Sequence, residues 1–318
     1  MRQLWALLLV VATMALCSCG DGASSMLPKS GGRPYEVLIT SNDTAAGLVV
    51  DSVLSQDATC LPQPEPEFDT SLIDSTGLNG ITRLARCIVK ITVNPKLFTK
   101  TRIRYDKNVW ARQQLVVYIN TPSAETLKRD MRASGRRLIG LLVRSEMNNA
   151  ISSLTASRNT AADSMVKATA GLGMRVPADM KSSKKGRNFI WLSNNAASGM
   201  VNICVYTYPG TDLSGGHFIT MRDSVMRINI PGEHDGMYLA TVRDEVLFKT
   251  EKIRHRNVMI ASGLWEMRND AMGGPFVAHA VVDSVDKKVV VAEAFVYAPE
   301  MKKRNLIRRA EAALYTLD

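Results

Sequence analysis

Two spacings of hydrophobic residues alternate along this chain, one typical of helices and one typical of strands. Residues 123–167 have the helical spacing, with Leu, Met or Ile recurring mostly at every third or fourth position. Shorter helices are predicted at 44–54, at 217–226 and from about residue 300 onward. Runs rich in β-branched and aromatic residues predict strands at 35–41, 86–94, 115–120, 188–193, 201–208, 238–242, 257–267, 276–283 and 288–297.

These elements predict an α+β fold with a mainly antiparallel sheet, or sheets, and helices packed on it. Its most prominent helices are a long central helical segment and a C-terminal amphipathic helix. The central segment is either one helix or a hairpin broken around residues 157–160, and Gly171 and Gly173 predict its end. A division near 171–175, into lobes 34–173 and 174–318, also stays open.

The first residues have the pattern of a secretory signal peptide. After Arg2, residues 4–17 are apolar except for Thr13. As a helix this segment of 14 residues would span about 21 Å, whereas a bilayer core is about 30 Å thick. The segment is therefore too short for a membrane span and suits a cleaved signal.

Residues 16–20, Leu-Cys-Ser-Cys-Gly, end that apolar run and resemble a bacterial lipobox. The resemblance implies a diacylglycerol thioether on Cys19 and cleavage before it. Cys17 fits less well, because Leu16 would occupy the position where a small residue is expected. We expect a signal peptide at 1–18, a flexible tether at 19–33 and a folded domain at 34–318. The alternative is an ordinary secretory signal with two incidental cysteines.

Composition excludes several classes of protein and helps to place this one in the cell. With 46% hydrophobic and 22% charged residues, the chain is neither collagen-like nor wholly disordered. The formal net charge is +10, but a secreted protein does not share a compartment with bulk nucleic acid. We therefore expect no nucleic-acid partner. The tether has a single acidic residue, Asp21, which favours an outer-membrane lipoprotein facing the periplasm.

The C-terminal helix has a run of basic residues beside its apolar stripe. They are Lys302, Lys303, Arg304, Arg308 and Arg309. One interpretation is a solvated helix face. The other is a face turned toward anionic headgroups, where each basic residue contributes about 1 kcal/mol.

Recognisable catalytic, metal and phosphate motifs are missing from the sequence. The four histidines are isolated, and no HExxH, CxxC, GxSxG, GxxxxGK[ST] or GxGxxG occurs. We therefore expect no metal and no cofactor. Cys60, Cys87 and Cys204 allow at most one disulfide among three pairings, which the sequence leaves open. His279, in an apolar strand, is expected to be a core or edge histidine with its polar atoms satisfied.

The best candidate binding residues lie in residues 264–275, where two predicted strands meet at a Gly-Gly-Pro turn. They are Trp265, Glu266, Arg268 and Asp270. In the functional interpretation, Trp265 is a platform and the charged residues are polar contacts. In the structural interpretation, this is a hairpin whose Trp and Met side chains pack on the core. The Pro-rich residues 61–68 either dock a partner or wrap the fold.

Several long phrases together resemble a known family. They are LPQPEPEFD (61–69), GLNGITRL (77–84), RDSVMRINIPG (222–232), LWEMRNDAMGGPFVAH (264–279) and FVYAPEMKKRNLIRRAEAALYTL (295–317). They resemble an uncharacterised Bacteroidota lipoprotein family, domain-of-unknown-function family 4837, over residues 35–317. The resemblance implies an envelope location. It suggests no particular activity, because none is established for the family.

These observations favour a non-enzymatic, lipid-anchored protein of the cell envelope. Its expected partners are membrane lipid, through the acylated N-terminus, and an envelope protein or anionic envelope polymer. The alternative is an envelope hydrolase with a carboxylate or histidine centre in residues 264–279. That alternative requires Glu266, Asp270 and His279 to share one concave pocket.

Overall fold

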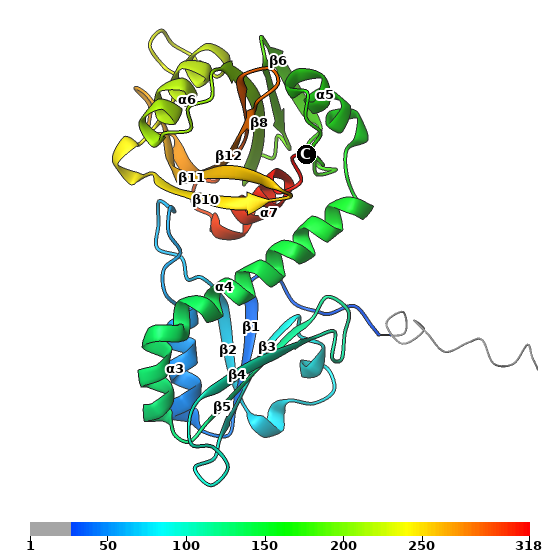
Figure 1. Ribbon diagram of the computed structural model, residues 1–318, viewed down its shortest axis with the longest axis vertical. Helices are drawn as coiled ribbons and strands as arrows, with labels where there is room; N and C mark the ends of the chain where they lie inside the picture. The colour runs from blue at the N-terminus through cyan, green and yellow to red at the C-terminus, as the bar shows by residue number, and fades with distance from the viewer. Residues whose placement is uncertain (1–26) are drawn as a thin grey trace, which may run out of the picture. The chain divides into compact units, whose positions relative to one another are not determined.

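A computed structural model describes residues 27–318, which form two compact units. Unit 1 contains the described residues up to Asp51 together with Thr70–Ala133. Unit 2 contains Ser52–Asp69 together with Ser134–Asp318. Each unit is built on a sheet of its own (Figure 1). The division near 171–175 that the sequence left open lies inside unit 2.

Unit 1 is built on a five-stranded mixed sheet in the order β2-β1-β3-β5-β4. Strands β1, β3 and β5 run parallel, and β4 pairs antiparallel with β5. The strands are β1 (Glu36–Ser41), β2 (Asp69–Asp74), β3 (Cys87–Val93), β4 (Arg102–Lys107) and β5 (Leu115–Thr121). Two short 3-10 helices, η1 (Ser75–Gly77) and η2 (Thr82–Leu84), precede β3.

Helix α3 (Thr44–Leu54) follows β1 and begins the long connection that parallel neighbours require. Its buried side chains Ala46, Val50 and Leu54 recur every fourth residue. The Asp43 carboxylate accepts a hydrogen bond of 2.9 Å from the backbone N–H of Ala46. This is the helix start that the sequence predicted.

Unit 2 is built on an eight-stranded antiparallel sheet in the order β10-β11-β12-β13-β8-β7-β6, with β9 pairing β11. This larger sheet confirms the expected α+β fold with a mainly antiparallel sheet. Its strands are β6 (Ser182–Gly186), β7 (Phe189–Ser193), β8 (Met200–Pro209), β9 (Leu239–Thr241), β10 (Leu247–Ile253), β11 (Arg256–Met267), β12 (Gly273–Asp283) and β13 (Lys288–Tyr297). A third 3-10 helix, η3 (Arg243–Glu245), connects β9 to β10.

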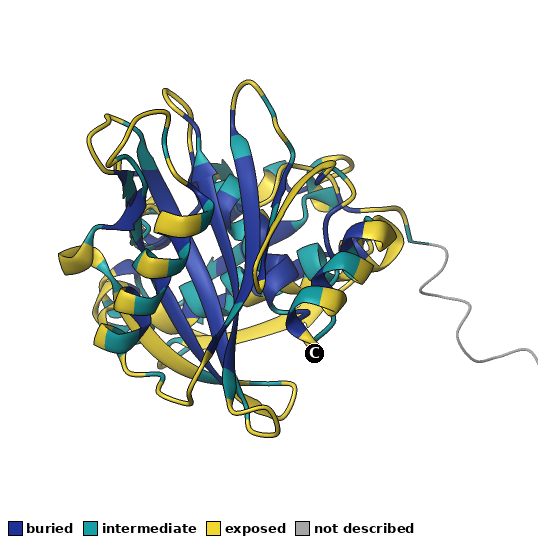
Figure 2. Cartoon of the chain, turned by 90° about the horizontal axis from the view of Figure 1, so that it is seen from above, coloured by how far each residue is buried: buried dark blue, intermediate teal, exposed yellow. Residues whose placement is uncertain are grey.

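Helices cover both faces of the larger sheet, so its central strands are buried (Figure 2). On one face, α5 (Thr160–Ala170), α7 (Arg304–Leu314) and part of α4 (Ala124–Ala156) complete a core rich in Val and Ala. On the other face, α6 (Gly215–Asn229) completes a core rich in aromatic and Met side chains. This two-sided burial explains why the central strands read as nearly continuous apolar runs.

The predicted central segment is two helices. Helix α4 is 33 residues long, and residues 157–159 separate it from α5. Asn159 accepts a hydrogen bond of 3.1 Å from the N–H of Ala162 and caps α5, which ends at Gly171 with φ 80°. The break thus falls where the hairpin alternative placed it.

Candidate functional site

The candidate segment 264–275 forms the hairpin between β11 and β12. Trp265 pairs with Gly274 and is only 2% exposed. Its indole N–H donates a hydrogen bond of 3.2 Å to the carbonyl oxygen of Val296. The ring packs edge-on against Phe295, with 5.5 Å between the ring centres. The indole is therefore part of the core and has no open face for a ligand.

The charged residues of this hairpin interact locally. Glu266 and Arg268 form an ion pair of 3.0 Å, and the Asp270 carboxylate accepts a 2.6 Å hydrogen bond from the N–H of Ala271. His279 is six residues along β12 from Gly273, the register partner of Glu266, which corresponds to about 20 Å. The structure therefore does not bring Glu266 and His279 into one proton-transfer centre.

Unit 2 contains a ligand-sized cavity elsewhere, with a volume of about 610 Å³. Its walls come from residues 58–61, the second part of α4, the strands β10, β11 and β12, and helix α7. None of the four predicted binding residues lines it. Its apolar lining includes Leu61, Val143, Met147, Ile151, Ile253, Phe276, Val277 and Ile307.

Five basic side chains also line this cavity, and three of them are neutralised nearby. Lys249 pairs with Glu251 at 2.8 Å, Arg304 pairs with Asp69 at 2.7 Å, and Arg308 pairs with Glu67. The other two, Arg144 and Lys252, are exposed and form no ion pair within residues 27–318. An apolar wall beside two available cations suits a ligand with an apolar part and an anionic group.

A cysteine lies on the cavity wall. The Cys60 thiol donates a hydrogen bond of 3.3 Å to the carbonyl oxygen of Ser262. Burial raises the pKa of this thiol above its ordinary 9.0, so it is protonated at neutral pH. Cys60, Cys87 and Cys204 form no disulfide with one another, which answers the question that the sequence left open.

His279 lies behind the cavity wall with a buried polar atom. It is 1% exposed, and its Nε2 lies 3.9 Å from Glu311 Oε1. Its ring packs edge-on against Tyr315, with 4.7 Å between the ring centres. Both Glu311 and Tyr315 line the cavity. His279 is thus a core histidine as expected, but its Nε2 has no hydrogen-bond partner in the described part of the chain.

A buried polar cluster occupies the other face of the sheet, and the sequence interpretation missed it. Arg222 of α6 donates hydrogen bonds of 2.7–3.1 Å to Glu293 of β13, and both side chains are 0% exposed. Arg222 also donates to Thr241, and Tyr206 donates to Glu293. Burial opposes the charge of Arg222, but Glu293 outweighs it and the pKa of Arg222 is raised. A lone Glu inside the apolar strand 289–296 was the available signal.

Four of the five basic residues in the C-terminal run are paired with acidic side chains. Lys302 and Arg304 pair with Asp69, Arg308 pairs with Glu67, and Arg309 pairs with Asp179. Lys303 is 4% exposed, and its ammonium group donates to the carbonyl oxygen of Met301. Of these acidic partners, Glu67 lies in the Pro-rich residues 61–68 and Asp69 directly follows them, so this segment wraps the fold.

No group of three His, Cys, Asp or Glu residues placed to hold a metal ion occurs in residues 27–318. The cavity is lined by apolar and charged side chains. Their arrangement allows ligand binding through apolar contact and charge.

The protein is thus of the mixed α+β class, and its larger unit contains a ligand-sized cavity. Residues 159–316 belong to the family "Domain of unknown function (DUF4837)", whose model they match. Residues 30–155 match a second family, "Domain of unknown function (DUF8532)". The phrases at 61–69 and 77–84 thus fall within the second match. No curated protein matches the chain.

Proposed function

We propose that this protein is a lipid-anchored binding protein of the cell envelope, and that it binds an amphiphilic anionic ligand in the cavity of unit 2. The ligand class has an apolar portion and one carboxylate, phosphate or sulfonate group. Its role is binding rather than turnover. The proposal combines the lipobox at Cys19 with the charge and shape of the cavity.

The observation that carries the proposed binding is the contrast among the basic residues of the cavity. Lys249, Arg304 and Arg308 already have acidic partners, whereas Arg144 and Lys252 have none in the described chain. Structural ion pairs account for the first group. An anion of the ligand is the natural counter-charge for the second.

The anchor is the other part of the proposal. Cys19 and the signal peptide at 1–18 lie outside the described residues, 27–318. Within that range, no helix is long and apolar enough to cross a membrane. We propose that a diacylglycerol thioether at Cys19 holds the protein at the periplasmic side of the outer membrane.

A fluorescent fatty acid, 11-(dansylamino)undecanoic acid, tests the cavity. We expect the protein to bind it with enhanced dansyl emission and to bind its uncharged methyl ester at least tenfold more weakly. The pair Arg144→Glu and Lys252→Glu should lower affinity by at least tenfold. The matched pair Lys181→Glu and Lys185→Glu, exposed elsewhere on unit 2, should leave it unchanged. Equal binding by all three proteins would refute the proposed ligand class.

Mass spectrometry of the N-terminal peptide tests the anchor independently. The expected product begins at Cys19 and has a mass increased by a diacylglycerol group, with or without an N-acyl chain. Cys19→Ala should move the protein out of the membrane fraction or leave it as uncleaved precursor. A wild-type protein that keeps its initiator methionine would contradict the anchor without bearing on the cavity.

A further inference from the structure

A basic surface in unit 1 surrounds the point where the described chain begins. The segment 28–31 is held there by backbone hydrogen bonds, from Arg112 N–H to the Pro28 carbonyl oxygen (2.7 Å) and from Gly31 N–H to the Leu84 carbonyl oxygen (2.8 Å). Further bridges pair Lys29 with Arg112 and Gly31 with Ala85. Three segments, 27–36, 75–86 and 108–114, therefore meet at this point.

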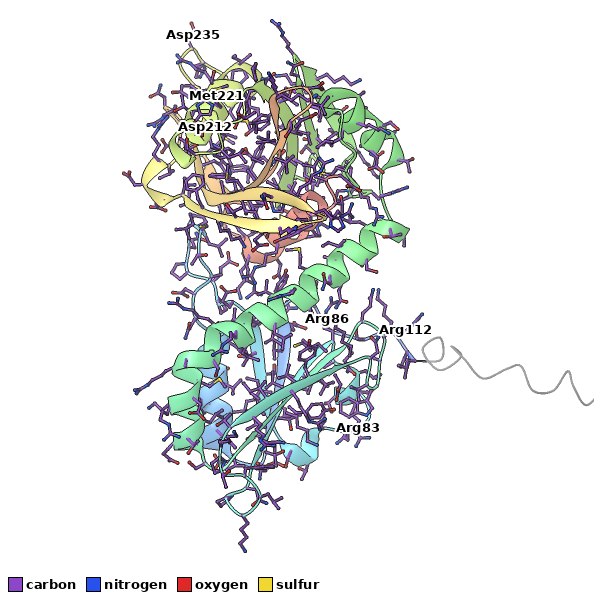
Figure 3. The ribbon with its side chains drawn as sticks, viewed as in Figure 1. Arg83, Arg86, Arg112, Asp212, Met221 and Asp235 are labelled. Carbon is purple, nitrogen blue, oxygen red and sulfur yellow. The ribbon has the colours of Figure 1, made fainter. Side chains whose placement is uncertain are left out.

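These three segments are strongly basic. They contain five basic residues and one acidic residue, for a net charge of +4. The basic residues are Lys29, Arg33, Arg83, Arg86 and Arg112. The acidic one, Glu36, pairs with Arg33. Figure 3 labels Arg83, Arg86 and Arg112, which lie on the side of unit 1 where the described chain begins.

Two hydrophobic side chains accompany the charges. Ile81, at the start of η2, is 87% exposed. The Arg83 guanidinium lies 5.8 Å from the centre of the partly exposed Trp110 ring. Exposed aliphatic, Trp and basic side chains together are typical of surfaces that lie at the headgroup level of a bilayer.

We infer that this surface, defined by Lys29, Ile81, Arg83, Trp110 and Arg112, docks on an anionic phospholipid bilayer. The inference rests on the proposed anchor for its biological setting. Leu27 follows Cys19 by eight residues, so the chain can span at most about 28 Å between them. A lipid at Cys19 would therefore keep this surface close to the headgroups, where its charge is complementary to anionic lipids.

Vesicle sedimentation with the unlipidated chain, residues 20–318, tests the surface without the anchor. We expect binding to vesicles of 70% phosphatidylcholine and 30% phosphatidylglycerol, and at least tenfold weaker binding to phosphatidylcholine alone. The variant Lys29→Glu, Arg83→Glu and Arg112→Glu should lower the partition coefficient on anionic vesicles by at least tenfold. Raising NaCl from 0.1 M to 0.5 M should also weaken binding of the wild type to anionic vesicles, because salt screens the attraction between charges.

The matched control reverses three exposed charges of unit 1 away from this surface, Lys96→Glu, Lys100→Glu and Arg132→Glu. Lys96 and Lys100 follow the C-terminal end of β3, whereas Arg86 precedes its N-terminal end. Brominated lipid should quench Trp110 emission in the wild type and lose this effect in Trp110→Phe. Equal loss of binding in both triple variants, or no preference for anionic vesicles, would overturn the inference. Failure of lipidation at Cys19 would leave this vesicle result standing.

Discussion

Arg222 and Glu293 show how single residues organise the aromatic face of unit 2. Their side chains are fully buried, and the guanidinium also lies 4.0 Å from the centre of the Phe276 ring. Thr241 and Tyr206 occupy further hydrogen-bonding positions of the pair. A buried charge is tolerated because its hydrogen-bonding partners take the place of the water it has lost. Removing one member of the pair therefore leaves the other charge buried without a counter-charge.

Arg222→Met should therefore lower the free energy of unfolding by about 3–5 kcal/mol, because it leaves the Glu293 carboxylate buried without its cation. Urea denaturation followed by circular dichroism measures this. The double variant Arg222→Met with Glu293→Leu should recover much of the loss. A double variant as unstable as the sum of the single variants would contradict this account.

Cys60 differs from the other two described cysteines in its access to solvent. Cys87 and Cys204 are buried, whereas Cys60 is partly exposed on the cavity wall. In residues 20–318, N-ethylmaleimide should therefore modify one thiol in the native protein, and Cys60→Ser should abolish the reaction. Because burial raises the pKa of Cys60, the rate should continue to rise with pH beyond 9.0. Fast labelling of Cys204 would show that the core opens.

Bound ligand should change this labelling. Since Cys60 lines the cavity, dansyl-undecanoic acid at saturation should slow modification of its thiol at least severalfold. The Arg144→Glu and Lys252→Glu variant should lose this protection at the same probe concentration. Stopped-flow or quenched mass spectrometry measures the rates.

At the scale of elements, helix α7 begins without a cap of its own. The N-cap position is Lys303, and its side chain forms no capping hydrogen bond. Glu65, from the Pro-rich segment, accepts hydrogen bonds from the backbone N–H groups of Lys303 (2.6 Å) and Arg304 (3.0 Å). A remote carboxylate thus supplies the acceptor and the negative charge that a helix N-terminus requires.

Glu65→Ala should destabilise unit 2 by about 2–3 kcal/mol, because it leaves two buried N–H groups without an acceptor. Thermal unfolding followed by circular dichroism tests this. Glu65→Gln, which keeps one carbonyl acceptor, should lose less. The control Glu233→Ala removes an exposed carboxylate of the same unit and should change stability little.

The ion pairs of Asp69 with Lys302 and Arg304, at the start of α7, make the stability of unit 2 sensitive to pH. Burial opposes the charge of Asp69, but Arg304 and Lys302 outweigh this and lower the pKa of the Asp69 carboxyl. Its stabilising contribution is therefore present above the unfolded pKa, about 3.9, and is lost as pH falls through the lower folded pKa. The difference in unfolding free energy between wild type and Asp69→Asn should shrink below about pH 4. A difference that is constant from pH 7 to pH 3 would contradict this.

At the scale of the whole molecule, the family boundaries do not coincide with the structural units. The DUF4837 match covers residues 159–316, but unit 2 also includes Ser52–Asp69 and the part of α4 from Ser134 onward. Met147 and Leu154 of α4 are buried in the core of unit 2, and Glu65 caps α7. The matched region alone therefore lacks part of its own core.

Residues 159–318 expressed alone should fold poorly, with high protease sensitivity and no cooperative thermal transition. Residues 52–318 keep every segment of unit 2 and should give a cooperative transition. Limited proteolysis and calorimetry distinguish the two chains. A stable, cooperative 159–318 would show that the added segments are dispensable.

Sequence patterns predicted the central strands and main helices but missed strands β2, β4, β6 and β10. Strands β4 and β6 are exposed at every position, and β10 is mostly exposed. They lie at sheet edges, where no buried face imposes alternation on their side chains. Backbone pairing with an already ordered neighbour is enough to make them strands, and this leaves little trace in composition.

The sequence did not point to the cavity, for a related reason. Trp265 and its neighbours attracted attention as aromatic and charged residues near a turn, but packing decided that Trp265 is part of the core. The cavity combines residues 58–61 with α4, β10 and α7, and no short motif contains these together. Nothing in the sequence sets Arg144 and Lys252 apart from other surface residues. They stand out only in the structure, because the other basic residues of the cavity have acidic partners and these two do not.

By itself, the sequence determined most of the periodic elements of this protein and its α+β class, because these depend on local side-chain patterns. It offered the break after α4 as one of two alternatives. Tertiary structure alone decided that the acidic Pro-rich segment neutralises and caps helix α7, and that Arg222 meets Glu293 inside the core. Those contacts join residues 71 to about 240 positions apart. Their energies depend on burial and on which partner is within reach, and neither property belongs to any residue in isolation.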